Sequence, residues 1–396
     1  FYDRCFRVSC DVSISDNLSF VSGFDYSLRK LDYSWNTVDL KVISRYVNIF
    51  MDTPPDSFDY EKVFNYKAGY AEMTFKFFKV AMMRMGLRLN QYSHGNYTSL
   101  DPRWNFTYFL SDNLRIKLGY GYFTQTLSYC TEYGFYNFAS LLFPSSGNYP
   151  RAIHRVAECE YVGKNGKLQL TAAIYSKSFF NLLFVDGKHR FGTGEGESRG
   201  VECSVAMETA RGSRIKLMYA YSVAIKKFKG ESFFPNYDQR HKATLIAERS
   251  FNKRWFVTGV VNFASGRPAN LYDMIYYTPT GVSFSETPDG TEEQGVSYTE
   301  FVPVVLRFPK NAFRYPYFVR FDVAVNRKWY FRWGTMTLYL QIINVFNRKN
   351  VVYYKDLEVQ YAKPSSPEST DLAIRCKVHA FYGFPFLPFV GISVKF

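Results

Sequence analysis

The chain has 396 residues and a formal net charge of +14, from 49 Lys and Arg against 35 Asp and Glu. Apolar residues make up 47% and aromatic residues 19%, yet no uninterrupted apolar stretch approaches the roughly 18 residues that a membrane-spanning helix needs. The basic residues are scattered and form no basic block, so the composition argues against a helical membrane protein and against a nucleic-acid-binding protein.

Apolar and polar residues alternate from near the start of the chain, which predicts β-strands with two unlike faces. In the first of these, Phe6 and Val8 share one face and Arg7 lies on the other. The pattern continues in hairpins to the C-terminus. The predicted strands are Arg4–Ile14, Leu18–Leu31, Phe64–Phe77, Val80–Gln91, Leu100–Leu110, Leu114–Thr124, Arg151–Val162, Lys167–Lys177, Arg199–Thr209, Arg214–Ala224, Arg240–Arg249, Arg254–Ala264, Tyr317–Arg327, Thr335–Phe346 and a last strand within His379–Phe396.

Short and long connections alternate between these strands. The long ones are 32–63, 126–149, 179–197, 226–238, 266–315 and 347–378, with a shorter one at 93–98. Short turns on one side and long loops on the other are typical of outer-membrane barrels, whose short turns face the periplasm. The sequence therefore predicts an all-β fold, a transmembrane antiparallel β-barrel of the bacterial outer membrane, with about fifteen strands in this chain.

The last strand alternates to the final residue of the chain. Val390, Ile392, Val394 and Phe396 fall on one face. The edge strand of a soluble sandwich is the alternative interpretation. An aromatic last residue suits the bilayer rim, however, so Phe396 is interpreted as an outer-membrane terminal signal.

Residues 1–396 are expected to form one transmembrane barrel domain. A count of about fifteen strands is odd, whereas bacterial single-chain barrels have even counts. An antiparallel meander with an odd count also closes only through a parallel seam. Because the chain opens at Phe1, one strand before a short turn, we expect strands to be missing at the N-terminal side. The remaining wall would then come from an N-terminal segment or from a partner chain.

Short motifs in a fixed order point to a family. The segment Tyr339–Tyr354, YLQIINVFNRKNVVYY, resembles the late-barrel signature of TonB-dependent outer-membrane receptors, especially those of the Bacteroidetes type. Arg320-Phe-Asp322 is similar to the start of the strand before it. The other similar motifs, in the family's order, are Asp101–Arg103, Gly119–Gln125, Pro150–His154, Ser198–Glu202, Asp238–His241 and Ser265–Pro268.

The resemblance implies a barrel of about 22 strands whose lumen is closed by an N-terminal plug. The strands predicted here would be the last ones of that barrel. The plug, the segment that engages TonB and the first strands would lie outside this chain, so TonB is implied as a partner through that N-terminal part.

Six charged residues are candidates to face the lumen, since a charge on the lipid face costs ~2–4 kcal/mol at mid-bilayer. They are Arg84, Arg88, Glu202, Glu208, Arg320 and Asp322. On one of their strands, Val319, Phe321, Val323 and Val325 are assigned to the lipid face. Inward charges of this kind contact a plug, line a ligand path, or simply face a solvated lumen.

The predicted loop 266–315 is rich in aromatic and acidic residues, and long loops of this kind are usually functional. Its candidates for an extracellular binding surface are Tyr272, Tyr276, Tyr277, Phe284 and Tyr298. Aromatic surfaces bind sugars, peptides, siderophores or a partner protein, and the sequence does not choose among these.

The other patterns predict no enzyme activity, no cofactor and no metal site. The five histidines stand apart without paired ligand spacing. The glycines of 192–196 lack the Lys-Ser/Thr of a phosphate loop, and this segment is interpreted as an ordinary loop. The cysteines form no C-x-x-C pair. Cys130 and Cys376 lie in predicted loops, and a disulfide between them is left open.

Two functions follow from these patterns. The first is a TonB-dependent receptor barrel for energised uptake of an unidentified nutrient. The second is a transporter-derived barrel that serves as a non-transporting scaffold or binding subunit of an outer-membrane assembly. Expected partners are the lipid bilayer and lipopolysaccharide, with a surface lipoprotein or another outer-membrane subunit as a further candidate.

Overall fold

The computed structural model describes residues 2–36, 57–130, 141–144, 149–163, 165–185, 191–209, 212–269, 274–279, 282–284, 296–298, 301–306, 311–361 and 374–396. Regular structure within these ranges consists of β-strands. No helix in them is long and apolar enough to span a membrane.

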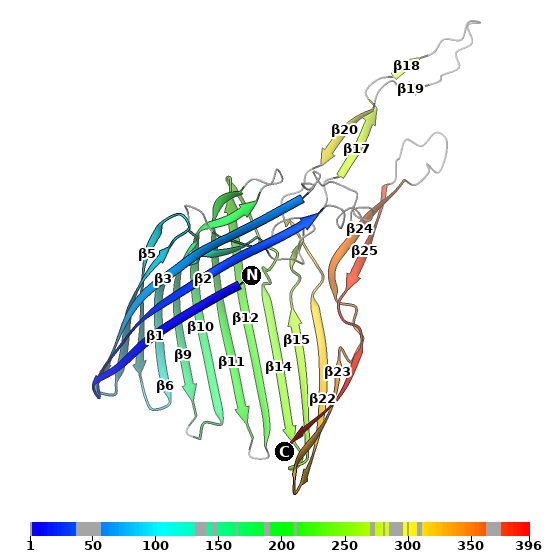
Figure 1. The fold of residues 1–396 in the computed structure, drawn as a ribbon. Coiled ribbons are helices and arrows are strands. Elements are labelled where there is room, and N and C mark those ends of the chain that lie inside the picture. Colours follow the sequence, from blue (N-terminus) through cyan, green and yellow to red (C-terminus); the bar gives the residue numbers. More distant parts are fainter. Residues whose placement is uncertain are drawn as a thin grey trace, which may run out of the picture.

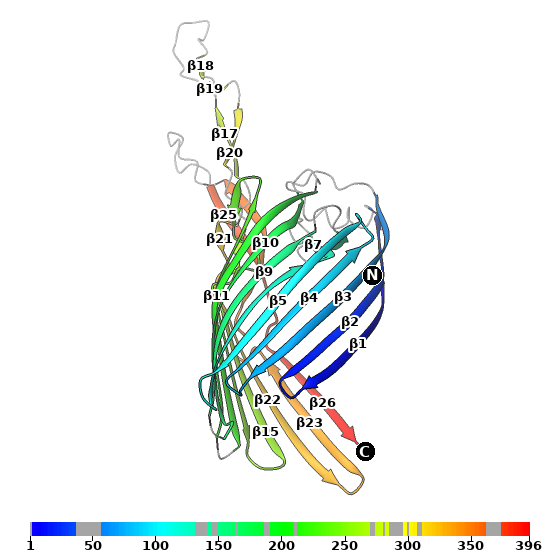
Figure 2. The same ribbon diagram turned by 90° about the vertical axis from the view of Figure 1, so that its left-hand side faces the viewer.

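One antiparallel sheet dominates the structure and curls into an open, barrel-like wall (Figures 1 and 2). Its strands, in spatial order, are β1 Tyr2–Ser15, β2 Leu18–Asn36, β3 Ser57–Phe77, β4 Ala81–Tyr92, β5 Tyr97–Phe109, β6 Leu114–Thr124, β9 Arg151–Val162, β10 Leu168–Val185, β11 Phe191–Glu208, β12 Ser213–Phe228, β14 His241–Ser250, β15 Trp255–Ala264, β22 Phe318–Phe331, β23 Gly334–Ile343 and β26 Leu387–Lys395. β13 (Glu231–Phe233) pairs with β12 and brings the sheet to 16 strands. The predicted all-β antiparallel fold is confirmed.

β1 and β26 are the two edges of this sheet. β1 pairs with β2 and β26 with β23, and within the described ranges no backbone pairing joins the two edges. Open edges in lipid leave backbone donors and acceptors unsatisfied. The expectation that further strands complete the wall stays a prediction.

The two faces of the sheet differ in chemistry. Residues directly opposite each other on neighbouring strands point to the same face, so the pairing can be followed from β4 to β22. Followed in this way, the six charged lumen candidates share one face, here called the polar face. The opposite, apolar face carries Leu87, Ile174 and Ile392, whose side chains are 51%, 59% and 66% exposed. Exposed apolar side chains of this kind are expected where a sheet contacts lipid.

The short turns lie together at the lower end of the sheet in Figure 1, and the long connections lie at the upper end. The chain ends among the short turns. Phe396 follows β26, is 97% exposed, and has its ring centroid 5.7 Å from that of Trp333 in the β22–β23 turn. Aromatic side chains at this level match the rim of a bilayer.

β10 and β11 continue well beyond the predicted strands, so the predicted loop 179–197 is wrong. Their pairing extends to Val185 opposite Phe191. The glycines of 192–196 lie within β11, where a Cβ on Gly194 would come within 2.6 Å of the Phe184 ring. Glycine lets the strand pass close beneath this ring, and the same glycines gave the segment the sequence appearance of a loop.

Two-stranded ribbons occupy several other predicted loops. They are β7 Leu127–Cys130 with β8 Leu141–Pro144, β16 Pro268–Ala269 with β21 Phe313–Arg314, β17 Met274–Pro279 with β20 Phe301–Leu306, β18 Val282–Phe284 with β19 Val296–Tyr298, and β24 Val351–Tyr361 with β25 Ile374–Tyr382. Cys130 and Cys376 therefore lie in β7 and β25, not in loops.

The aromatic loop candidates fall on these ribbons. Tyr276 and Tyr277 lie in β17, Phe284 in β18 and Tyr298 in β19, while Tyr272 lies outside the described residues. The ribbons project beyond the long-connection end of the sheet (Figures 1 and 2). Their assignment to a binding surface stays a prediction.

We predict that Ile174→Lys destabilises the reconstituted protein by about 2–4 kcal/mol, because it places a charge on the apolar face in lipid. Ala173→Lys is the matched control, since Ala173 lies on the polar face directly opposite Glu158 and Glu202. Urea unfolding in liposomes measures both variants. A larger loss for Ala173→Lys would show that the two faces are assigned the wrong way round.

Candidate functional site

A cluster of charged side chains on β1, β2 and β4 forms the centre of the candidate site. Asp25 is 6% exposed and accepts hydrogen bonds from Arg7 Nε at 2.6 Å and from Arg88 Nη2 at 2.6 Å. The Arg7 side chain is 72% exposed and that of Arg88 only 20%. Water therefore screens the Arg7 pair far more than the Arg88 pair, and the Arg88–Asp25 contact is the one that fixes the geometry.

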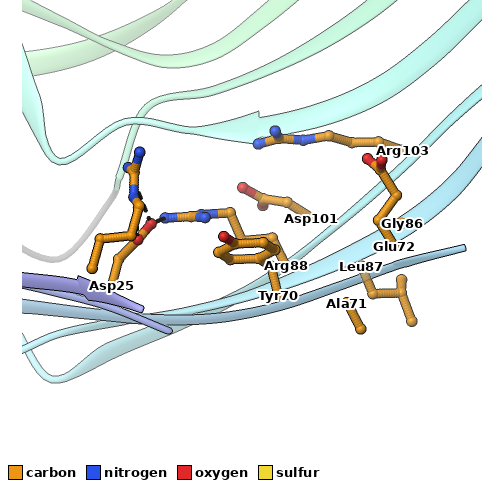
Figure 3. A pocket seen from close by; sticks show the side chains of 10 residues that line it. Asp25, Tyr70, Ala71, Glu72, Gly86, Leu87, Arg88, Asp101 and Arg103 are labelled. Carbon is orange, nitrogen blue, oxygen red and sulfur yellow. Dashed lines mark hydrogen bonds and ion pairs between the residues drawn. The ribbon is translucent and has the colours of Figure 1, made fainter. Parts of the chain in front are cut away.

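A cavity of about 260 Å³ lies beside this cluster. Figure 3 shows Asp25, Arg88, Asp101 and Arg103 pointing to one side of the strands and Leu87 pointing to the other. The charged groups that line it are three arginines and three carboxylates: Arg7, Arg88, Arg103, Asp25, Glu72 and Asp101. This balance suits a partner that carries both hydrogen-bond donors and acceptors more than it suits a simple anion or cation.

Hydrogen bonds extend the cluster from β4 to β5 and β6. Arg88 Nε donates to Asn90 Oδ1 at 3.0 Å, and Asn90 Nδ2 donates to Asp101 Oδ2 at 3.0 Å. Asp101 also accepts from the Thr124 backbone nitrogen at 3.0 Å and from its hydroxyl at 2.8 Å. Asn90 and Asp101 are 2% and 3% exposed. Because these buried polar groups are satisfied, the network holds each side chain in one position.

A stack of tyrosines continues from the cluster toward the long connections. The Tyr66 hydroxyl accepts from Arg88 Nη2 at 2.6 Å. Ring centroids are 5.2 Å apart for Tyr66 and Tyr92, 4.8 Å for Tyr92 and Tyr149, and 4.5 Å for Tyr149 and Tyr97. Tyr149 lies just before β9, and its hydroxyl donates to the carbonyl oxygen of His94 in the β4–β5 turn. This stack was not predicted, because its members lie on β3, β4 and β5 and just before β9 and are far apart in the sequence.

The predicted lumen residues do not form a single site. Arg88 belongs to the central cluster, whereas Arg84 on β4 pairs with Glu72 at 3.2 Å. Glu208 on β11 pairs with Arg214 at 3.4 Å, and Glu202 lies opposite small residues of β10 and β12. On β22, Arg320 Nε donates to Asp322 Oδ2 at 2.9 Å. These residues are distributed around the polar face, several strands apart.

A second charged group lies on β6 and β9 and was not predicted. Arg115 donates to Glu160 through Nε at 2.9 Å and through Nη2 at 2.5 Å, and Lys117 lies 2.7 Å from Glu158. Both pairs of like charges are spaced two residues apart, which is a signal for one face of a strand. The sequence of one strand does not show which strand it pairs with, so the pairing of these basic residues with the glutamates of β9 could not be predicted.

The asparagines of the family-like segment hold the upper ends of β22 and β23. The Asn344 backbone nitrogen donates to Asp322 Oδ1 at 2.9 Å, and its side-chain amide donates to the Arg348 carbonyl at 3.0 Å. Asn350 exchanges two hydrogen bonds with the backbone of Val319, at 3.0 and 2.8 Å. Asn344 has φ +54°, a conformation that asparagine tolerates better than most residues. The asparagines of this motif therefore have a structural role, because their hydrogen bonds hold the ends of β22 and β23.

The motifs 238–241 and 265–268 meet at the long-connection end. Asp238, whose side chain is fully buried, accepts from the Ala224 backbone nitrogen at 2.7 Å and forms ion pairs with Arg240 at 3.0 Å and with Arg314. The His241 backbone nitrogen donates to the Ser265 hydroxyl at 3.1 Å. A buried carboxylate with two guanidinium partners fixes these connections to the sheet.

Within the described ranges, no group of three or more His, Cys, Asp or Glu is placed to hold a metal ion. Cys5, Cys10, Cys159 and Cys203 are free and exposed.

The sequence matches no protein-family model and no curated protein. The structure, in contrast, is similar to solved receptors. The ferric yersiniabactin uptake receptor of Yersinia pestis has a TM-score of 0.60 at 12% identity, over 99% of this chain and 53% of that one. The FrpB iron transporter of Neisseria meningitidis has a TM-score of 0.56 at 12% identity, over 99% and 54%. The ferripyoverdine receptor of the outer membrane of Pseudomonas aeruginosa has a TM-score of 0.55 at 10% identity, over 90% and 45%.

The structural neighbours are TonB-dependent siderophore and iron receptors of the outer membrane, and they are transport receptors rather than enzymes. The chain has the fold of their β-barrel wall and spans about half the length of each. At these identities the likeness shows the fold.

We predict that Arg88→Gln lowers the free energy of unfolding by about 1–3 kcal/mol, since it removes a charge-assisted hydrogen bond from a buried carboxylate. Arg7→Gln is the matched control and should change stability little, because the Arg7 side chain is mostly in water. Urea titration in detergent compares the two. An equal loss of stability in the two variants would contradict the conclusion that the more buried Arg88 pair contributes more to stability than the exposed Arg7 pair.

Tyr149 lies outside the strands that cross the membrane, and burial, with the neighbouring Tyr97, raises the pKa of its phenol to about 12. A tyrosine in the unfolded chain loses its proton at about pH 10. Between these values the unfolded chain binds fewer protons than the folded one, so stability falls as the pH rises. Urea midpoints measured across this window should fall more for the wild type than for Tyr149→Phe. An equal fall of the urea midpoint in the two proteins would contradict the assignment of the raised pKa to Tyr149.

Proposed function

We propose that this chain is the C-terminal part of the barrel wall of a TonB-dependent outer-membrane receptor that imports a scarce nutrient. The observation that carries the proposal is the structural likeness to iron and siderophore receptors, which extends over 88–99% of this chain. The separation of charged and apolar side chains onto opposite faces of one sheet supports it, because a transporter wall needs water on one side and lipid on the other.

In this proposal the polar face lines the interior of the barrel. The wall is completed to about 22 strands by further sequence of the same receptor, whose lumen is closed by a plug. The cluster of Arg7, Asp25 and Arg88 presents charges of both signs toward that interior. It is a candidate contact for the plug or for a passing ligand, and TonB acts through the plug-bearing part. Lipid and lipopolysaccharide surround the apolar face, and a surface lipoprotein is a candidate partner at the long connections.

Uptake measurements test the proposed function. The full receptor gene is deleted from its host, and cells are starved of iron and supplied with radiolabelled ferric chelates of several classes. Ferric chelates are the first substrates to test because the neighbours named above act on them. We expect one class to depend on the gene, and we expect an uncoupler of the proton-motive force to abolish its uptake.

The full gene restored on a plasmid is the control for this deletion. If the deletion changes the uptake of none of the tested nutrients, and a partner protein co-purifies with the barrel, transport is contradicted and the scaffold function is favoured. Gene-dependent uptake that persists with the uncoupler would contradict coupling to TonB.

A further inference from the structure

Arg327 lies on the apolar face of the sheet, where a charged side chain is unexpected. It stands directly opposite Trp255 on β15 and Leu338 on β23, and Leu338 in turn is opposite Ile392 on β26. Its chain neighbours Val325 and Trp329 point to the same face by strand alternation. A charge that faces lipid is most costly at the bilayer midplane and least costly at the interfaces.

The position of Arg327 along its strand places it at the short-turn end. β15 begins at Trp255 and β22 ends at Phe331, only a few residues beyond Arg327. The β22–β23 hairpin lies with the other short turns at the lower end of Figure 1. In an outer-membrane barrel this end faces the periplasm, so Arg327 lies at the level of the inner-leaflet headgroups.

Two indole rings hold the Arg327 guanidinium. Its carbon Cζ lies 5.0 Å from the Trp255 ring centroid and 4.6 Å from that of Trp329. The rings attract the cation through their π faces, but they accept no hydrogen bond from the N–H groups in the plane of the guanidinium. Arg327 Nε is buried without a hydrogen-bond partner, and no carboxylate of the described chain forms an ion pair with it. Because Nε itself is enclosed by the protein, an acceptor from outside the described chain would approach the terminal Nη nitrogens of the guanidinium.

The surroundings of Arg327 are uniformly basic. The segments 249–257 and 325–336 contain no Asp or Glu. Their basic residues are Arg249, Lys253, Arg254, Arg327, Lys328 and Arg332. Arg249 shares the apolar face, since it stands opposite Val257, two residues from Trp255. A local excess of positive charge at a membrane surface attracts anionic lipid.

We propose that Arg327, which contacts the rings of Trp255 and Trp329, binds the phosphodiester of an anionic phospholipid in the periplasmic leaflet. Guanidinium N–H groups match phosphate oxygens in geometry and charge. The flanking indoles occupy the zone between headgroup and acyl chain that tryptophan favours. The proposal rests on the membrane barrel of the proposed function and not on transport.

Native mass spectrometry of the full receptor in mild detergent tests this site. Phosphatidylglycerol and phosphatidylcholine with the same acyl chains are added in separate titrations. Both lipids carry a phosphodiester, but the choline cation of phosphatidylcholine neutralises its charge and is repelled by the basic residues around Arg327. The wild type should therefore retain phosphatidylglycerol about tenfold more tightly, the scale of one charge-assisted contact, and Arg327→Gln should remove that preference. Arg155→Gln is the matched control, because Arg155 stands on the same face, near the opposite end of the sheet.

Several outcomes would overturn the site: equal binding of the two lipids by the wild type, an unchanged preference in Arg327→Gln, or an equal loss in Arg155→Gln. If Arg327→Gln fails to fold, the wild type in nanodiscs supplies a second readout. Phosphatidylglycerol with brominated acyl chains should then quench tryptophan fluorescence more than brominated phosphatidylcholine, and equal quenching would overturn the proposal. A full receptor that does not insert into bilayers would instead contradict the proposed function.

Discussion

A chain that crosses a bilayer as strands has to satisfy each backbone amide and carbonyl within the protein, because lipid tails offer no partners. The strands of the main sheet between β1 and β26 meet this demand by antiparallel pairing on both sides, and within the described residues only the outer sides of β1 and β26 lack a paired strand. Pairing on both sides of a strand leaves side chains free only above and below the sheet. The separation into a polar and an apolar face follows, because water meets one face and lipid the other.

Charged residues on the polar face connect strands that the chain brings together. The pairs Arg88–Asp25 and Arg115–Glu160 each join different strands through short hydrogen bonds. Such pairs disfavour a slip of register, since a shift of one residue would turn every charge toward lipid. At the long-connection end the same purpose is served by Asp238 and Asn344, whose hydrogen bonds fix the connections to the strand ends. The polar face is thus an ordered surface before any partner binds it.

Alternation along the sequence predicted the strands and the polar faces because a period of two is a local property. It failed at β10 and β11, where glycines beneath aromatic rings imitate a loop, and at the ribbon of β17 and β20. Only part of the centre of the site could be predicted from the sequence. Arg88 was predicted to face the lumen, but its partner Asp25 was not, because it lies 63 residues earlier. That contact, like Lys117 with Glu158, depends on the register between strands, which no single segment contains.

One face of the main sheet meets lipid and the other meets water. Nitroxide scanning along β6 tests it most directly, with single labels from 114 to 124 in a cysteine-free background reconstituted in bilayers. Accessibility to oxygen should peak at Ile116 and Leu118, and accessibility to a water-soluble nickel chelate should peak at Arg115 and Lys117. Peaks at the opposite positions, or no alternation, would contradict it.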